Sequence, residues 1–455
     1  MAYFFCGIGG SGMLPLALIL KAQGEVVHGS DRSRDQGKTP EKFFFLESSG
    51  IPLFPQDGSG PAPGDTLVVS TAVEESIPDV GTARKLGLPI LKRAELLARC
   101  VNSEKERVVI AGTSGKTTVT GMTGYLLREL GHNPTVMNGG IFRNYVRDNP
   151  FCCAFTGKAG LFVTEADESD GSISLYNPSV AILTNISLDH VSLDELHQLF
   201  SAFLAKAPQA VLNLDDAGVA KLAADYKGKA LTFSLGDATT DLCAENISLR
   251  PDGSDCTVKG VSLSLQVPGK HNIANALAAL GAALQLGLSL EDCCKVLAGF
   301  QGIRRRLEVV GTANGITVID DFGHNPDKIA ATLVALRAFP GRLVVMFQPH
   351  GFGPLRLMRK ELAESFQNRL GPEDLLFMPE PYYAGGTVDR SVTSRHLVED
   401  LQQAGMKAEV LPDRAACKAP ILAAAKPGDR ILVMGARDDT LSDFARELLA
   451  GLSRP

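Results

Sequence analysis

The sequence lacks several features that mark special classes of protein. Its nine cysteines form no C-x-x-C pair, although adjacent cysteines occur at Cys152-Cys153 and Cys293-Cys294. Neither a zinc site nor a disulfide framework is therefore indicated, and we interpret the cysteines as small buried residues in a reducing compartment. No apolar run reaches the roughly 18 residues that a membrane span needs.

The chain also lacks a large excess of either sign of charge, with 45 Lys and Arg against 51 Asp and Glu. The net charge is −6 and no block of basic residues occurs, which argues against a nucleic acid as the main partner. The N-terminal segment has no basic region ahead of its glycines, so we expect no signal peptide. These absences together predict a cytoplasmic protein whose partner is neither a membrane nor a nucleic acid.

What remains is the composition of an ordinary globular protein. The 455 residues are 45% apolar and 21% charged, and this length predicts two to four domains. Strand-like β-branched runs alternate with helical patterns, which predicts an α/β fold. We expect three domains: a Rossmann-like domain over residues 1–103, a P-loop domain with a mainly parallel sheet over 104–303, and a second Rossmann-like domain over 304–455.

The most informative stretch is residues 107–118, RVVIAGTSGKTT. A β-branched run, a glycine turn and an amphipathic helix follow one another there, as in a phosphate-binding P-loop. The spacing is the short form G-x-x-G-K-T-T, because Ile110 stands where the first glycine of the common form belongs. Lys116 would add a full positive charge and Thr117 a hydroxyl for Mg²⁺. The candidate phosphate-binding residues are Gly112, Thr113, Ser114, Gly115, Lys116, Thr117 and Thr118.

A second glycine turn, residues 7–13, follows the first predicted strand. Asp31 ends the next strand about 22 residues later, which is close to a dinucleotide-binding pattern. This turn therefore binds either NAD(P) or the diphosphate of another nucleotide.

Polar side chains also end several later strands. Residues 165–170 contain four acids directly after a predicted strand, and His190 follows the next one. Glu165 and His190 are candidate ligands for a hard cation beside the P-loop. Residues 237–267 read as antiparallel hairpins beside the parallel sheet. The arginines at 304–306 form either a solvated turn or a guanidinium cluster that closes on a nucleotide.

Six groups of residues, in matching order and spacing over essentially the whole chain, resemble the Mur ligase family. They are Gly112 to Thr118, Glu165 to Ser169, Asn185-Ile186 with Asp189-His190, Gly269 to Ala276, Arg304 to Arg306, and Asp320 to His324. The resemblance implies a UDP-sugar domain, an ATPase domain and an acceptor-amine domain. It also implies that the first glycine turn holds a UDP diphosphate in place of NAD.

By this resemblance the chain is an ATP-dependent amide ligase of peptidoglycan precursor synthesis, with Mg²⁺, acting as a monomer or homodimer. The carboxylate of UDP-N-acetylmuramate would attack ATP to give an acyl phosphate, which an amino acid or peptide amine then attacks. The implied catalytic residues are Lys116, Glu165, His190 and Arg304, and the implied Mg²⁺ ligands are Thr117, Glu165 and His190.

The resemblance also distributes binding roles over the three domains. Besides the P-loop residues, ATP would contact Asn272, Arg304 and Asp321. The UDP-sugar would contact Gly9, Gly10, Ser11, Gly12, Met13, Asp31, Ser70, Thr71 and Arg93. The acceptor would contact Phe322, His324, His350 and Arg356.

The chain departs from the alanine-adding members of the family at positions that bear on the acceptor. Those members usually carry other residues where this chain has Ser114, Phe322, Asn325 and Gly351. The resemblance implies L-alanine as the amine, and these departures leave another amino acid or the tripeptide L-alanyl-γ-D-glutamyl-meso-diaminopimelate open as alternatives. A nucleotide-binding paralogue with little turnover is a further alternative, and Lys206 is a candidate carbamylation site.

Overall fold

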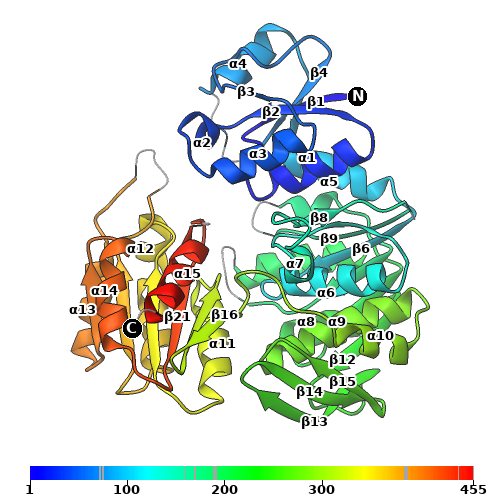
Figure 1. Cartoon of the computed structure of the whole chain (residues 1–455). Helices are drawn as coiled ribbons and strands as arrows, with labels where there is room; N and C mark the ends of the chain where they lie inside the picture. The colour runs from blue at the N-terminus through cyan, green and yellow to red at the C-terminus, as the bar shows by residue number, and fades with distance from the viewer. Residues whose placement is uncertain are drawn as a thin grey trace. The chain divides into compact units, whose positions relative to one another are not determined.

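The protein, shown in Figure 1 as a computed structural model, is built from three β-sheets, each of which is combined with α-helices. The structure describes residues 1–70, 73, 76–158, 160–168, 171–187, 192–383, 388–438 and 440–453. Two compact units divide the chain. One is Met1–Glu245 with Thr257–Leu263 and Ala274–Gln301, and the other is Asn246–Cys256 with Ser264–Ile273 and Gly302–Pro455. Among the described helices, none has both the length and the apolar character that crossing a bilayer requires.

The first sheet is parallel throughout, and its strand order reverses at β1. In the order of the sheet its strands are β3 (Leu53–Phe54), β2 (Val26–Ser30), β1 (Ala2–Cys6), β4 (Asp65–Val69) and β5 (Ile90–Lys92). Its helices are α1 (Met13–Ala22), α2 (Arg32–Asp35), α3 (Pro40–Ser48), α4 (Pro78–Lys85) and α5 (Arg93–Asn102). Phe4 and Phe5 of β1 are fully buried, as in a parallel strand covered on both faces. The glycine turn after β1 thus lies where open α/β sheets bind ligands.

The second sheet has ten strands, with the P-loop strand β6 (Glu106–Ala111) inside it. The strands on one side of β6 are β9 (Leu161–Glu165), β7 (Thr135–Met137) and β8 (Ala154–Phe155). On the other side are β10 (Val180–Leu183), β11 (Gln209–Asn213), β12 (Lys229–Ser234), β13 (Leu242–Arg250), β14 (Gly253–Val258) and β15 (Val261–Leu265). The helices are α6 (Lys116–Glu129), α7 (Leu193–Leu204), α8 (Ala217–Asp225), α9 (Lys270–Gln285) and α10 (Leu290–Leu297). Both neighbours of β6 run parallel to it.

The third sheet has six strands and one antiparallel edge. In the order of the sheet the strands are β16 (Glu308–Ala313), β17 (Ile316–Asp321), β21 (Arg430–Gly435), β18 (Leu343–Gln348), β19 (Leu375–Pro379) and β20 (Ala408–Leu411). Only the pairing of β16 with β17 is antiparallel. The helices are α11 (Pro326–Arg337), α12 (Phe352–Gln367), α13 (Ser394–Gln403), α14 (Arg414–Ala424) and α15 (Leu441–Leu452).

The predicted three-part α/β fold is confirmed, and two details differ from the sequence analysis. The segment expected as hairpins beside the central sheet supplies β13, β14 and β15, which continue that sheet beyond β12. The pairing between β12 and β13 is parallel. The edge strand β16 was not predicted, because its alternation is short and interrupted by Gly311, where the register of the ladder shifts. The domain boundaries near residues 103 and 303 stay predictions.

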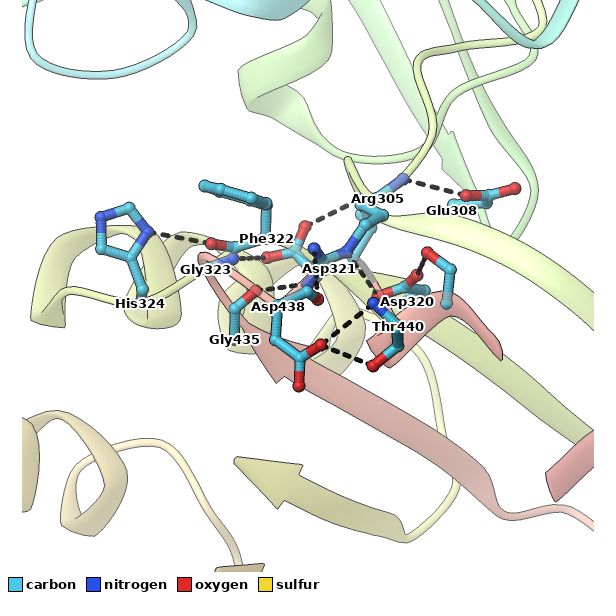
Figure 2. A network of polar contacts seen from close by, with 12 residues as sticks. Arg305, Glu308, Asp320, Asp321, Phe322, Gly323, His324, Gly435, Asp438 and Thr440 are labelled. Atoms are coloured by element: carbon cyan, nitrogen blue, oxygen red, sulfur yellow. Dashed lines mark hydrogen bonds and ion pairs between the residues drawn. The ribbon is translucent and has the colours of Figure 1, made fainter. Parts of the chain in front are cut away.

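A buried polar network joins strand ends of the third sheet (Figure 2). Arg305 is 8% exposed, and its guanidinium donates to the carbonyl oxygens of Gly435 at 2.5 Å and Asp438 at 3.1 Å. Its Nε lies 3.4 Å from Oδ1 of Asp320, whose Oδ2 accepts a hydrogen bond from Ser442 at 2.7 Å. The network therefore ties the segment before β16 to the ends of β17 and β21.

We expect Asp320 to give the third domain a characteristic pH dependence. Burial raises the pKa of Asp320 to about 6, against the opposing effects of Arg305 and Ser442. The pKa of Asp320 is higher in the folded than in the unfolded protein. Its contribution to the free energy of unfolding is therefore fully present below the unfolded-state pKa and is lost as the pH rises through the folded-state pKa. The free energy of unfolding of the wild type, minus that of Asp320→Asn, should therefore fall by about 2–3 kcal/mol between about pH 4 and 6.

Urea unfolding of both proteins across this pH range measures that difference. Above about pH 7 the difference should be constant, because Asp320 is then ionised in both states. A difference that is flat between about pH 4 and 6 would contradict the assignment of the titration to Asp320.

Candidate active site

The central glycine turn, Gly112–Gly115, joins β6 to α6 as the sequence predicts. Gly112 and Gly115 have φ angles of 125° and 88°, which residues with a side chain rarely adopt. A Cβ atom on Gly112 would also lie 2.1 Å from Oγ1 of Thr184. Because α6 begins at Lys116, the free N–H groups and the positive end of the helix face the turn. The turn can therefore hold an anion.

Asn185, just beyond the end of β10, fixes this turn. Its Oδ1 accepts hydrogen bonds from Oγ1 of Thr113 at 2.7 Å and from the backbone N–H of Ser114 at 2.8 Å. Its Nδ2 donates to the carbonyl of Ser114 at 3.0 Å, and Thr184 Oγ1 donates to the same carbonyl at 2.7 Å. Asn185 entered the sequence analysis only as part of a motif. Its place at the end of the strand beside β6 was the signal for this role.

Lys116 lies between the turn and an acid. Its Nζ donates to the carbonyl oxygen of Gly112 at 2.7 Å and pairs with Oε2 of Glu168 at 2.6 Å. The side chains of Lys116 and Glu168 are only 15% and 6% exposed, so the pair is largely shielded from water. The ammonium is thus held at the turn by Glu168, which the sequence showed only as one of four clustered acids.

Thr117 and Glu165 supply the oxygen atoms of a candidate cation site. Thr117 Oγ1 donates to Oε2 of Glu165 at 2.9 Å, and the other carboxylate oxygen faces Gly139, where a Cβ atom would lie 2.3 Å from it. A hydroxyl and a carboxylate are hard ligands that suit Mg²⁺. Within the described residues no group of three His, Cys, Asp or Glu side chains could form a metal site. The residues present fit a cation that takes its remaining ligands from phosphate and water.

Several predicted residues lie outside the described part of the chain. They are Thr71, expected to contact the UDP-sugar, Asp170 of the acidic cluster, and Asp189 and His190, of which His190 is the second expected cation ligand. Their roles stay predictions.

In the first domain, Asp31 holds the glycine turn. One carboxylate oxygen accepts the backbone N–H of Gly9 at 2.8 Å, and the other accepts that of Ser33 at 2.8 Å, where Asp31 caps α2. The side chain is 8% exposed. The structure thus gives Asp31 a structural role in addition to the predicted contact with the UDP-sugar.

Two cationic side chains lie against the same turn. Lys42 Nζ donates to the carbonyl oxygen of Gly9 at 3.2 Å. Arg93 packs against Gly12 so closely that a Cβ atom there would lie 2.9 Å from its Cδ. The structure therefore brings the predicted Arg93 to the predicted glycines, and it adds Lys42, which no local sequence pattern marked. Two cations at a glycine turn suit a diphosphate.

The other predicted residues of this turn differ in exposure. Gly10 and Ser11 are exposed, and Ser70, just after β4, is half-buried. Met13 begins α1, is 2% exposed and packs into the core of the sheet. Its side chain therefore has a packing role in this structure.

In the third domain, Asp321 is a buried acceptor at the end of β17. Its carboxylate accepts the backbone N–H of Leu307 at 2.7 Å, the N–H of Gly323 at 2.8 Å and the hydroxyl of Thr332 at 3.0 Å. Asp321 thus fixes the loop that follows it, part of which Figure 2 shows. Among the three arginines, Arg305 is engaged in the buried network described above, whereas Arg304 is half-buried.

Asn272, the predicted adenine contact, lies in the first turn of α9 and is 4% exposed. Its Nδ2 donates to the carbonyl oxygen of Pro268 at 2.8 Å, which fixes the side chain. The neighbouring His271 has a lowered pKa because of burial, with Asp321 acting in the opposite direction.

Three of the four predicted acceptor residues gather at the ends of β17 and β18. The rings of His324 and His350 lie 4.8 Å apart, and Phe322 lies 5.6 Å from His324. The ring nitrogen Nδ1 of His324 is 3.0 Å from the carbonyl oxygen of Phe322 (Figure 2). The guanidinium groups of Arg305 and Arg306 lie 5.0 and 4.7 Å from the ring of Phe322. This cluster combines polar and aromatic groups of the kind that bind small molecules.

Arg356, the fourth predicted acceptor residue, has a different setting. It lies on α12, its side chain is 49% exposed, and it pairs with Asp389. Two positions at which the chain departs from the alanine-adding family members are explained by local structure. Asn325 caps α11 by accepting the N–H of Lys328 at 3.0 Å, and Gly351 precedes α12 with a φ of 152°.

Three family models match successive parts of the chain. The model described as "Mur ligase family, catalytic domain" matches residues 2–105, the "Mur ligase middle domain" matches 110–283, and "Mur ligase, glutamate ligase domain" matches 305–437. Their order is the order of the three sheets.

Curated relatives and solved structures agree with these matches. A UDP-N-acetylmuramate–L-alanine ligase of Acidithiobacillus ferrooxidans is 36% identical over 450 residues, which cover 94% of each chain. That of Dinoroseobacter shibae is 36% identical over 98% of this chain and 96% of its own. The UDP-N-acetylmuramate–alanine ligase of Thermotoga maritima superposes with a TM-score of 0.81 at 27% identity, covering 99% of this chain and 98% of its own. A murein peptide ligase of Psychrobacter arcticus gives 0.73 at 25% identity, covering 100% and 99%. The Gly112–Gly115 turn, with Lys116, Thr117 and Glu165 beside it, stands within a fold shared along the whole chain, and the chain belongs to the Mur ligase family.

Proposed function

We propose that the chain joins the carboxylate of UDP-N-acetylmuramate to L-alanine in the cytoplasm, with hydrolysis of ATP to ADP and phosphate. The observation that carries the proposal is the arrangement of Lys116, Thr117 and Glu165 at the Gly112–Gly115 turn. The names of the curated relatives, at 35–36% identity over nearly the whole chain, support the choice of substrates.

The proposed reaction has two steps. The lactyl carboxylate of the UDP-sugar attacks the γ-phosphorus of ATP, the bond to the bridging oxygen breaks, and ADP leaves. The α-amine of L-alanine then attacks the acyl carbon of the acyl phosphate, loses a proton, and expels inorganic phosphate from the tetrahedral intermediate. Neither step needs a covalent bond to the protein, so positioning and charge stabilisation carry the catalysis.

Each domain contributes binding groups to these steps. At the Gly112–Gly115 turn the backbone N–H groups and Lys116 bind the β- and γ-phosphates. Lys42 and Arg93 neutralise the diphosphate of the UDP-sugar at the first glycine turn, whose backbone Asp31 holds in place.

Thr117 and Glu165 would hold Mg²⁺, and His190 is proposed as a further ligand. The ion supplies positive charge that neutralises the phosphate oxygens during transfer. Asn272, Arg304 and Asp321 are proposed to orient the nucleotide. The oligomeric state, a monomer or a homodimer, stays a prediction.

The cluster of Phe322, His324 and His350 in the third domain is the proposed acceptor site. Its surroundings also allow a second candidate for the acceptor. Arg356 pairs with Asp389 at the surface, so the carboxylate of a free amino acid depends on other groups. The similarity to a murein peptide ligase favours a peptide amine as the alternative acceptor. The alternative substrate is L-alanyl-γ-D-glutamyl-meso-diaminopimelate.

Phosphate release with ATP, Mg²⁺ and UDP-N-acetylmuramate tests the proposal across a panel of amines. L-Alanine should support turnover, while glycine, L-serine and the tripeptide should give lower kcat/KM values. Turnover with the tripeptide alone would keep the mechanism and replace the acceptor. The absence of phosphate release with all four amines would contradict the proposed function.

Replacing Lys116 tests the phosphate-binding turn directly. In Lys116→Ala the rate of ADP formation should fall by roughly 10²–10³-fold, because a positive charge on the transferred phosphoryl group is lost. Lys407→Ala is a matched control, since the side chain of Lys407 lies at the surface and pairs there with the exposed Glu373. An unchanged rate in Lys116→Ala would refute the assignment of this turn.

The proposed acceptor site gives a prediction that is independent of the Gly112–Gly115 turn. In His350→Ala the KM for the amine should rise roughly tenfold, the effect of losing one polar contact of about 1.4 kcal/mol, with the KM for ATP unchanged. His132→Ala, at an exposed position in the central domain, should leave both constants unchanged. Equal KM values for the amine in His350→Ala and the wild type would remove His350 from the acceptor site.

A further inference from the structure

The turn Asn138–Gly140 brings β7 to the cation site. Strand β7 runs parallel to β9, with Thr135 opposite Phe162 and Met137 opposite Thr164. This register places the residues directly after Met137 beside Glu165, the last residue of β9. The turn therefore stands next to the carboxylate that is proposed to bind Mg²⁺, at the same edge of the sheet.

Gly139 lies against the other oxygen of that carboxylate, Oε1. Glu165 Oε2 is engaged by Thr117 at 2.9 Å. A Cβ atom on Gly139 would lie 2.3 Å from Oε1 of Glu165, 3.2 Å from its Cδ and 3.3 Å from Oγ1 of Thr117. The shortest of these distances is far below van der Waals contact, so an alanine there would displace the carboxylate.

The need for glycine at this position is one of space. Gly139 is not among the glycines with positive φ, so other residues could adopt its backbone conformation. It is also exposed, whereas the preceding Asn138 is 1% exposed. The turn thus presents an open, side-chain-free surface toward Glu165.

The turn itself has little freedom to move away. The backbone N–H of Asn138 donates to the carbonyl oxygen of Cys153 at 2.9 Å, and its Nδ2 donates to that of Gly140 at 3.2 Å. Among the described residues nothing pairs with Oδ1 of Asn138, which is buried. A buried unpaired acceptor costs about 1–3 kcal/mol, a cost expected at functional sites more than at purely structural turns.

Glu165 has little freedom either. Its backbone is fixed by the parallel register that sets it opposite Ile110 of β6. Its carboxylate is held by the hydrogen bond from Thr117 Oγ1 to Oε2 at 2.9 Å, so a shift that relieves the contact with residue 139 acts on this bond. A side chain at residue 139 would therefore change the distance between the two cation ligands.

We infer that Gly139 is a positioning residue for the cation site: its missing side chain lets Glu165 and Thr117 present their oxygen atoms to one divalent ion. The inference rests on the proposed function, because that function assigns the ion to these two residues. It predicts that Gly139→Ala weakens the binding of a divalent cation with nucleotide, and does so through Glu165.

Binding of Mn²⁺ in the presence of ADP, followed by the loss of the free-ion EPR signal, measures this effect in the full chain. Gly139→Ala should bind Mn²⁺ about 10-fold more weakly than the wild type, the size seen when groups that orient metal ligands are changed. Gly236→Ala is the control, because Gly236 is in the same domain and a Cβ atom there would meet nothing within 4 Å. Unchanged Mn²⁺ affinity in Gly139→Ala would overturn the inference.

A double-mutant cycle with Glu165→Asp tests the route of the effect. The shorter aspartate withdraws from residue 139, so adding Gly139→Ala to Glu165→Asp should cost much less affinity than adding it to the wild type. Equal losses in the two backgrounds would show that Gly139 acts elsewhere and would overturn the inference.

Thermal unfolding keeps the test decisive if Gly139→Ala is unstable. Relief of the steric conflict predicts that Glu165→Asp raises the Tm of Gly139→Ala, and no recovery of Tm would contradict the proposed contact. These measurements need neither UDP-sugar nor amine. A protein that binds Mn²⁺ with ADP but releases no phosphate would therefore contradict the proposed function while leaving this inference to be judged separately.

Discussion

The central site depends on the hydrogen bonds between Asn185 and the Gly112–Gly115 turn. Parallel pairing sets Ala111 of β6 opposite Leu183 of β10, so both strands end at the same level. Asn185 follows at that edge and holds both the N–H and the carbonyl of Ser114. With the turn fixed, Lys116 and Thr117 have defined positions at the start of α6, where they contact Glu168 and Glu165.

A similar device recurs in the other two sheets. Asp31 at the end of β2 accepts the N–H of Gly9, and Asp321 at the end of β17 accepts those of Leu307 and Gly323. In each sheet a polar side chain at a strand end fixes a neighbouring loop by accepting its backbone N–H groups. Such a carboxylate orders the loop, and its remaining lone pairs limit what it can offer a ligand.

The features that could be predicted from the sequence are those determined by neighbouring residues in the chain. A β-branched run, glycines that need positive φ and a helix start lie together at residues 107–118, so the strand, the glycine turn and the helix found there could be predicted. The α/β alternation of all three parts followed from the same kind of pattern. The sequence did not predict that β13, β14 and β15 continue the central sheet, because the partners of a strand are set by the whole sheet.

The partners that complete the sites could not be predicted, because they are distant in the chain. Lys42 contacts Gly9 across 33 positions, and Arg305 contacts Gly435 across 130. No local pattern marks Gly139 either, since its importance comes from the register of β7 against β9. The resemblance to a family included Asn185, Asp31 and Asp321, but it did not show that they hold backbone N–H groups of neighbouring loops.

The pair between Lys116 and Glu168 has a consequence for nucleotide affinity. A phosphate that approaches the ammonium meets a carboxylate 2.6 Å from the same nitrogen, so part of the positive charge is already balanced. A balanced pair exerts less long-range attraction than a lone cation would, and the affinity for the phosphate therefore varies less steeply with ionic strength. Glu168 thereby limits the distance over which Lys116 attracts an anion.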